Sequence, residues 1–157
     1  MRIIEAVITL LCLSLLVACG GPTTDSTVPV AEPAGATSVD IGEHIVHFSA
    51  QSTDHLPPEV ARAYDFVRSK NRAMLTVSVL EQGTNQAVTA AVTVKTVNLT
   101  GQLKNVTMRT ITEGDAIYYI GETPIANRET LIFDITITPE GVDKSVDVRF
   151  KRRFFTN

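Results

Sequence analysis

Apolar and polar residues alternate along most of the chain from Ile41 to its end, and this pattern predicts β-strands. The alternation is most regular where Leu131, Phe133, Ile135 and Ile137 occupy every second position. The predicted strands cover 42–50, 73–80, 87–99, 103–112, 116–120, 131–137 and 146–150. Short stretches that contain Gly or Pro join them. The pattern is typical of an all-β protein with an antiparallel β-sandwich of about seven strands.

The arrangement that we expect for the two sheets is immunoglobulin-like. The chain has no tryptophan, so it is not a true antibody-type domain, although it can share that architecture. Alternation does not distinguish two packed sheets from one closed sheet, so a closed barrel is the alternative. Within the strand over 103–112 the alternation breaks near Thr110 and Ile111, which predicts a β-bulge.

Only one stretch between the predicted strands has a helical signal, near 58–64. Asp54 precedes it as a candidate cap, and Pro58 suits the first turn of a helix. Val60 and Tyr64 share one face at a spacing of four residues. The stretch is short, so we expect one or two helical turns between strands.

The N-terminal part of the chain has a different composition from the rest. Residues 1–18 contain an apolar run that follows a weakly positive start, which is typical of a secretory signal peptide and too short to span a bilayer. Residues 19–40 are rich in Gly, Pro, Thr, Ser and Ala, which predicts a flexible tether. We therefore divide the chain into a signal peptide at 1–18, a tether at 19–40 and a β-sandwich domain at 41–157.

The junction between the leader and the tether reads Leu16-Val17-Ala18-Cys19. These four residues resemble the lipobox of bacterial lipoproteins, in which the cysteine is acylated and becomes the mature N-terminus. The resemblance implies that Cys19 carries acyl chains such as palmitate and that the protein is bound to a membrane through them. An aspartate after the cysteine commonly retains such proteins in the inner membrane, and Gly20 stands there instead. We therefore expect the periplasmic face of the outer membrane.

Charge and cysteine content narrow the classes of function. Residues 41–157 carry 13 basic and 13 acidic side chains, and a neutral domain lacks the positive surface that nucleic acids require. Cys12 lies in the leader and Cys19 is the expected lipidation site, so the domain has no thiol. This excludes a disulfide framework, a cysteine zinc site and a thiol nucleophile.

Two stretches of the domain resemble an uncharacterised family of exported bacterial proteins, domain of unknown function 4426. The first runs from Leu56-Pro57-Pro58-Glu59 through Tyr64 and on to Ala73. The second runs from Asn98-Leu99-Thr100-Gly101 to Ile120. The resemblance covers nearly all of 41–157 and implies a β-sandwich domain behind a signal peptide. It assigns no catalytic residue.

Three histidines are the candidate metal ligands: His44, His47 and His55. Side chains alternate between the faces of a strand, so His44 and His47 point to opposite sides and cannot share an ion without a bulge. A metal site would need further ligands from other strands. We therefore interpret the three as ordinary surface or half-buried histidines, and expect no cofactor.

The candidate binding residues are basic or aromatic. Arg68, Lys70 and Arg72 form a short basic segment that could meet lipid phosphates or carboxylates, as could the basic run at 151–153. Tyr119 is paired in sequence with Tyr118, so one of the two must face the core and the other outward, where an exposed ring can bind a partner. Solvated loop charges and cross-strand packing are the simpler interpretations of all of them.

No catalytic sequence motif occurs in the chain. The hypothesis that fits best is a non-enzymatic, lipid-anchored module that binds a protein or another component of the cell envelope, because exposed sheet edges can recruit a strand from a partner. The alternative is an envelope protein that binds a small ligand or a metal ion.

Overall fold

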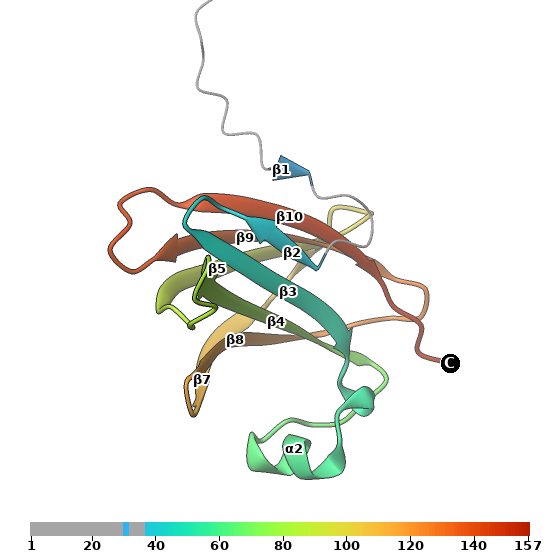
Figure 1. The fold of residues 1–157 in the computed structure, drawn as a ribbon. Helices are drawn as coiled ribbons and strands as arrows, with labels where there is room; N and C mark the ends of the chain where they lie inside the picture. The colour runs from blue at the N-terminus through green and yellow to red at the C-terminus, as the bar shows by residue number, and fades with distance from the viewer. Residues whose placement is uncertain (1–29, 32–36) are drawn as a thin grey trace, which may run out of the picture.

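The computed structural model describes residues 30–31 and 37–157, which form two β-sheets packed face to face (Figure 1). Sheet A has the strand order β1-β10-β9-β5-β6, and sheet B has the order β2-β3-β4-β8-β7. All pairs are antiparallel except β1 with β10. The strands are β1 (Val30–Ala31), β2 (Ser38–Asp40), β3 (His44–Ser52), β4 (Arg72–Glu81), β5 (Ala90–Asn98), β6 (Leu103–Lys104), β7 (Thr107–Glu113), β8 (Ala116–Pro124), β9 (Thr130–Pro139) and β10 (Val146–Arg153). The predicted antiparallel sandwich is confirmed.

The core lies between the sheets, where the predicted alternation places it. Every second residue of β9 is inaccessible to solvent: Leu131, Phe133, Ile135 and Ile137 are each 0% exposed. Phe133 stacks on Phe150 of β10 with ring centroids 4.8 Å apart, and Phe150 contacts Phe48 of sheet B at 4.9 Å. The three rings therefore join the two sheets directly.

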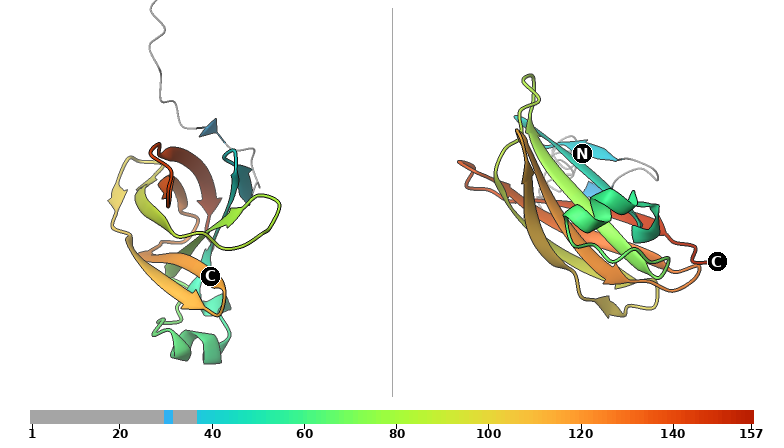
Figure 2. Two further views of the ribbon diagram at one scale, coloured as in Figure 1. Left: turned by 60° about the vertical axis from the view of Figure 1, so that its left-hand side comes forward. Right: turned by 90° about the horizontal axis from the view of Figure 1, so that it is seen from below.

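The helical stretch covers the outer face of sheet B. A 3-10 turn η1 (Thr53–His55) is followed by α2 (Pro58–Ala63), and both lie on the far side of the sandwich from β10 (Figures 1 and 2). Leu56, Ala61 and Phe66 pack there on Met74 and Ile120 as a second apolar cluster. The predicted helix is therefore present, and its burial against sheet B explains why so short a helix is stable.

The cap predicted for this helix is wrong. Asp54 lies in η1, and the residue at the N-terminus of α2 is Pro57, which forms no side-chain capping bond. The loop is instead fastened by Thr53, whose hydroxyl donates to the Val67 carbonyl at 2.8 Å and accepts from the Ser69 N–H at 2.9 Å. The buried Thr53 hydroxyl therefore holds this loop in place, and the Asp54 carboxylate does not cap the helix.

The strand predicted over 103–112 is two strands in different sheets. β6 pairs with β5 in sheet A, and β7 pairs with β8 in sheet B, with Asn105 and Val106 between them. The β7–β8 register runs without a break through Thr110 and Ile111, so the bulge predicted at these residues is wrong. The interruption in this stretch is a crossover between sheets at Asn105 and Val106, before the position of the predicted bulge.

The domain begins earlier than residue 41. β2 pairs with β3 through Ser38, Val39 and Asp40, so these residues are part of sheet B rather than of the predicted tether. Val30 and Ala31 pair with β10 as well. The predicted signal peptide, Cys19 and most of the tether lie outside the described residues, and their assignments stay predictions. In the portion that the structure describes, no helix has the length and apolar character needed to cross a membrane.

Candidate functional site

One edge of sheet A is only partly covered. β5 pairs with β9 along its whole length, from Ala90 to Asn98. On its other side β6 pairs with Thr96 and Val97 alone. Within residues 30–31 and 37–157, the backbone of Ala90–Lys95 therefore has no strand partner on the side away from β9. We call this stretch the open edge of β5.

Hydrogen bonds at both ends of β5 show which backbone groups face the open edge. The Asn98 N–H donates to the Gln102 carbonyl at 3.0 Å, on the β6 side. The Ala90 N–H donates to the Tyr119 hydroxyl at 2.6 Å, although Tyr119 belongs to sheet B. Because backbone groups alternate along a strand, those of Val92 and Val94 point the same way as these two. The edge thus presents two N–H donors and two carbonyl acceptors.

A pocket of about 360 Å³ adjoins the open edge where β6 separates from β5. Its lining comes from β5, β6 and the crossover to β7: Val94, Lys95, Thr96, Leu103, Lys104, Asn105, Val106 and Thr107. The Thr96 hydroxyl is buried and has no hydrogen-bond partner within the described chain. The pocket therefore has a mixed lining, in which apolar side chains alternate with polar ones that include two lysines and an unsatisfied hydroxyl.

Gly121 of β8 sets the shape of the crossover. A side chain at this position would collide with Val106 and would lie 2.6 Å from the Met108 sulfur. Because Gly121 has no side chain, Val106 and Met108 can fold inward over sheet B after the chain leaves β6. Glycine at this position therefore gives Val106 and Met108 the room they occupy just after the crossover.

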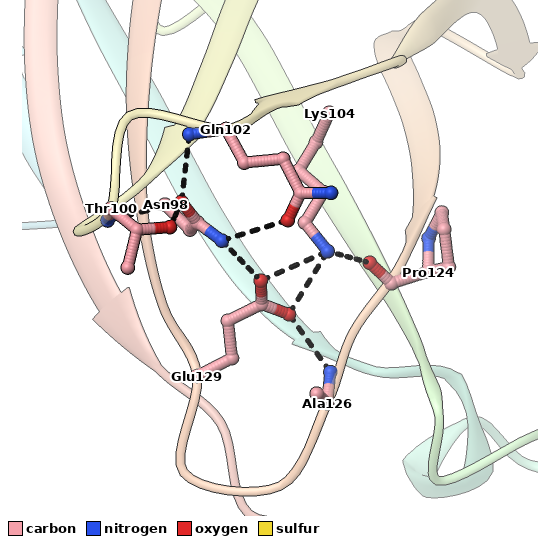
Figure 3. A network of polar contacts seen from close by, with 7 residues as sticks. All are labelled: Asn98, Thr100, Gln102, Lys104, Pro124, Ala126 and Glu129. Atoms are coloured by element: carbon pink, nitrogen blue, oxygen red, sulfur yellow. Dashed lines mark hydrogen bonds and ion pairs between the residues drawn. The ribbon is translucent and has the colours of Figure 1, made fainter.

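A network of polar contacts fixes β6 and the loop between β8 and β9 (Figure 3). The Lys104 ammonium lies 2.9 Å from a Glu129 carboxylate oxygen, and both side chains are largely buried, 15% and 10% exposed. Glu129 also accepts from the Ala126 N–H at 2.8 Å and from the Asn98 side-chain amide at 3.0 Å. Lys104 is thus held at the end of β6, beside the pocket.

The pKa of Glu129 lies below its ordinary value. Burial alone would raise the pKa of this carboxyl group, but hydrogen bonds from Lys104, the Ala126 N–H and Asn98 outweigh burial and stabilise the carboxylate. The charge of Lys104 acts in the same direction. The Glu129 carboxyl group is therefore ionised at neutral pH and is a fixed part of the site rather than a proton donor.

The sequence profile of a family described as a domain of unknown function (DUF4426) matches residues 38–157. The chain belongs to the DUF4426 family. Its fold is similar to the crystal structure of the DUF4426 protein PA0388 from Pseudomonas aeruginosa PAO1, at 32% identity and a TM-score of 0.67. That match covers 76% of this chain and 94% of PA0388.

A more distant likeness extends the comparison of the fold. FetP from uropathogenic Escherichia coli strain F11, which was expressed in the periplasm of E. coli, has 14% identity and a TM-score of 0.55. The match covers 80% of this chain and 97% of FetP, and shows a common fold. No curated protein matches the sequence.

The histidines do not come together in this DUF4426 protein. His44 and His47 lie in β3, where His47 pairs across to Ser78 and His44 to Glu81, while His55 is exposed in η1. Among the described residues, no three His, Cys, Asp or Glu side chains are arranged to hold a metal ion. The opposite faces predicted for His44 and His47 agree with the burial pattern of β3, in which Val46 and Phe48 face inward.

The four candidate binding residues do not form one site, because they lie in different parts of the structure. Arg68 donates to the Asp54 carbonyl, and Lys70 is exposed in the same loop. Arg72 lies 3.4 Å from Glu122 on the outer face of sheet B. Tyr119 is only 5% exposed and uses its hydroxyl to cap Ala90, so it is the inward member of the tyrosine pair and not an exposed platform.

Sequence reasoning did not identify the open edge of β5. The alternation of the predicted strand over 103–112 breaks near Thr110 and Ile111, within β7, and so gave no sign of the crossover at Asn105 and Val106. An alternation pattern reports which face a side chain occupies and carries no information on which strand lies beside it.

Proposed function

We propose that this protein is a lipid-anchored component of the bacterial cell envelope that binds an extended segment of a partner protein by β-strand addition. The observation that carries the proposal is the open edge of β5, where Ala90–Lys95 has one strand neighbour instead of two. Unpaired edges are normally kept short or covered, because they pair readily with other chains. Here the edge is long enough for several backbone hydrogen bonds.

The incoming strand would lie beside β5 beyond the end of β6. Val92 and Val94 offer it four backbone hydrogen bonds, two as donor and two as acceptor. Its alternate side chains would enter the pocket next to Val94 and Val106, while the others would pass the exposed side chains of Thr93 and Lys95. Backbone bonds would supply affinity, and the pocket would add selectivity for the side chains that enter it. The role is binding rather than catalysis.

A photo-crosslinker placed at Thr93 tests strand addition in living cells. We expect p-benzoylphenylalanine at this exposed position to form one recurrent protein adduct, and mass spectrometry to place the crosslink within an extended segment of the partner. The same group at Ser49, which is exposed on β3 of sheet B, is the matched control and is expected to give no such adduct.

The variant Val94→Pro decides whether the adduct depends on backbone pairing. The Val94 N–H points to the open edge rather than to β9, so proline removes a donor there without breaking the existing ladder. We expect the folded variant to lose at least nine-tenths of the adduct. An adduct that persists at full yield, or that forms equally from Ser49, would show that the edge does not capture a strand.

The lipid anchor is supported by Leu16-Val17-Ala18-Cys19 and by the tether-like composition that follows it. We expect intact-mass analysis of the membrane fraction to find a chain that begins at Cys19 and carries diacylglycerol. Cys19→Ala should abolish the added mass and leave the leader uncleaved. A mature protein without the lipid mass would contradict the anchor and leave strand addition untouched.

A further inference from the structure

The two outer faces of the sandwich are not equivalent. The helical segment of η1, α2 and the loop to β4 covers part of the outer face of sheet B, over Met74 of β4 and Ile120 of β8. In the described portion of the chain, nothing comparable lies over sheet A, whose outer face is formed by alternate residues of β5, β6, β9 and β10. This face therefore lacks the covering helix that occupies part of the opposite face.

Apolar side chains follow one another across the outer face of sheet A. The registers align Leu103 of β6 with Val97, Val97 with Ile132, and Ile132 with Lys151. Leu103 is 64% exposed, and Phe155, just beyond the end of β10, is 65% exposed. Large apolar side chains that share one exposed face, rather than being scattered singly, indicate a contact surface.

Basic side chains surround this apolar row. On the same face β5, β9 and β10 carry Lys95, Arg149, Lys151 and Arg153, against only Asp134 and Asp147. Both carboxylates are already engaged: Asp134 pairs with Arg149, and Asp147 accepts from the Thr136 hydroxyl. Lys151 and Arg153 form no ion pair with any other described residue, so a local positive excess remains although residues 41–157 carry equal numbers of basic and acidic side chains.

We propose that this surface contacts a membrane that contains anionic lipid. We define the sheet A patch as the apolar residues Val97, Leu103, Ile132 and Phe155 together with Lys95, Lys151 and Arg153. Apolar side chains can enter the boundary between headgroups and acyl chains, while ammonium and guanidinium groups bind lipid phosphates. The Arg153 guanidinium already lies 5.4 Å from the centre of the Phe155 ring, so both reach the same part of the surface.

The place where the N-terminal segment joins the domain agrees with this orientation. β1 pairs with β10, the strand that carries Lys151 and Arg153. Residues 20–29 separate Cys19 from β1 and can span at most about 35 Å. A lipid at Cys19 would therefore keep the domain close to the bilayer, although the charge and apolar pattern of the patch does not depend on that anchor.

Single tryptophans can report the contact, because the chain contains none. We expect Phe155→Trp, in the mature protein as purified from cells, to emit at shorter wavelength and to be quenched by brominated lipids in vesicles of phosphatidylcholine with phosphatidylglycerol. The matched control is Val67→Trp, since Val67 is 62% exposed on the α2 side of the molecule. An anchor alone brings both reporters near the vesicle, and only docking of the patch distinguishes them.

Charge variants distinguish binding through the sheet A patch from non-specific binding of the protein to vesicles. With Phe155→Trp as reporter, Lys151→Gln together with Arg153→Gln should lower the docking equilibrium about 25-fold, which is about fivefold for each charge near an anionic surface. Arg62→Gln with Lys70→Gln removes the same charge from the α2 side and should change docking less than twofold. Phosphatidylcholine alone should give little quenching of Trp at 155.

Equal responses from the two reporters, or no response to phosphatidylglycerol, would overturn the assignment to lipid. A shift at position 155 that appears with soluble envelope proteins and not with vesicles would identify a protein-binding surface instead and would overturn it too. Neither outcome bears on strand addition at β5, because that test uses Thr93 and Val94.

Discussion

Replacing Phe133 with alanine is expected to lower the free energy of unfolding by about 3–5 kcal/mol, the largest stability effect of any single change that we predict. Phe133 has no solvent exposure and lies at the centre of β9. Its ring stacks on Phe150, which in turn contacts Phe48 of the opposite sheet. Alanine would leave a cavity where the two sheets are joined, and close packing elsewhere in the core limits how far the neighbours can fill it.

The neighbouring residue of the same strand supplies the control. Ile132 faces outward and is only partly buried, so Ile132→Ala is expected to cost about 1–2 kcal/mol, because part of its side chain is already in contact with water. Denaturant titration of both variants, compared at equal slope, measures the difference. Similar losses from the two variants would show that the packing across the sheets is not what stabilises the domain.

Glu129→Gln is expected to lower the free energy of unfolding at neutral pH by about 1–3 kcal/mol. The donors that now surround the carboxylate keep only one acceptor oxygen in glutamine, and the NH₂ group faces the remaining donor. The positive charge of Lys104 also loses its ion-pair partner. Because this pair fastens β6 to the β8–β9 loop, the variant should also loosen the wall of the pocket beside β5.

Glu129→Gln should also change how the free energy of unfolding depends on pH. The pKa of Glu129 is lower in the folded protein than its ordinary value of 4.5, so its contribution is present above that value and is lost as the pH falls through the lowered folded pKa. Wild-type protein should therefore lose stability on acidification from about pH 5 downward more steeply than Glu129→Gln. Denaturant titrations at neutral and acidic pH provide the measurement.

Glu122→Gln is the matched control for both effects. Glu122 lies 3.4 Å from Arg72, but this pair is more open to solvent, with side-chain exposures of 43% for Arg72 and 20% for Glu122. We expect a loss of no more than about 1 kcal/mol, as for other solvent-exposed pairs. If Glu122→Gln destabilised the protein as much as Glu129→Gln, burial of the Lys104–Glu129 pair would not be the source of its effect.

The two proposed surfaces follow from the same departure of the chain from sheet A. After Lys104 the backbone crosses to sheet B, so that within residues 30–31 and 37–157 no strand pairs with Val92 and Val94 on the side away from β9. The short β6 still places Leu103 on the outer face beside Val97. Strand addition would use the edge of the sheet and lipid contact its face, so both can occur together on a protein held at a membrane.

The alternating pattern predicted the inner faces of the main strands correctly because burial of a side chain depends on its own residue type and on a period of two. Leu75, Val77 and Val79 are buried as expected, and so are the inward residues of β9. The helical turn near 58–64 was also predicted, since Pro58 and the spacing of Val60 and Tyr64 are local signals. The family resemblance, which depends on the sequence alone, is confirmed over residues 38–157.

Pairing between strands depends on residues that are far apart in the chain, so the local pattern of apolar and polar residues cannot predict it. Nothing in the sequence around Asn105 and Val106 shows that the chain changes sheets there. The residues that contact this crossover, Gly121 and Glu129, lie far along the chain. The Tyr119 hydroxyl likewise reaches Ala90 only because the two sheets face each other. The sequence by itself determined the absence of thiols from residues 41–157 and the inward faces of the main strands, and it predicted the leader. The tertiary structure decided which edge stays open and which outer face stays bare, because long-range packing selects the neighbours of each strand.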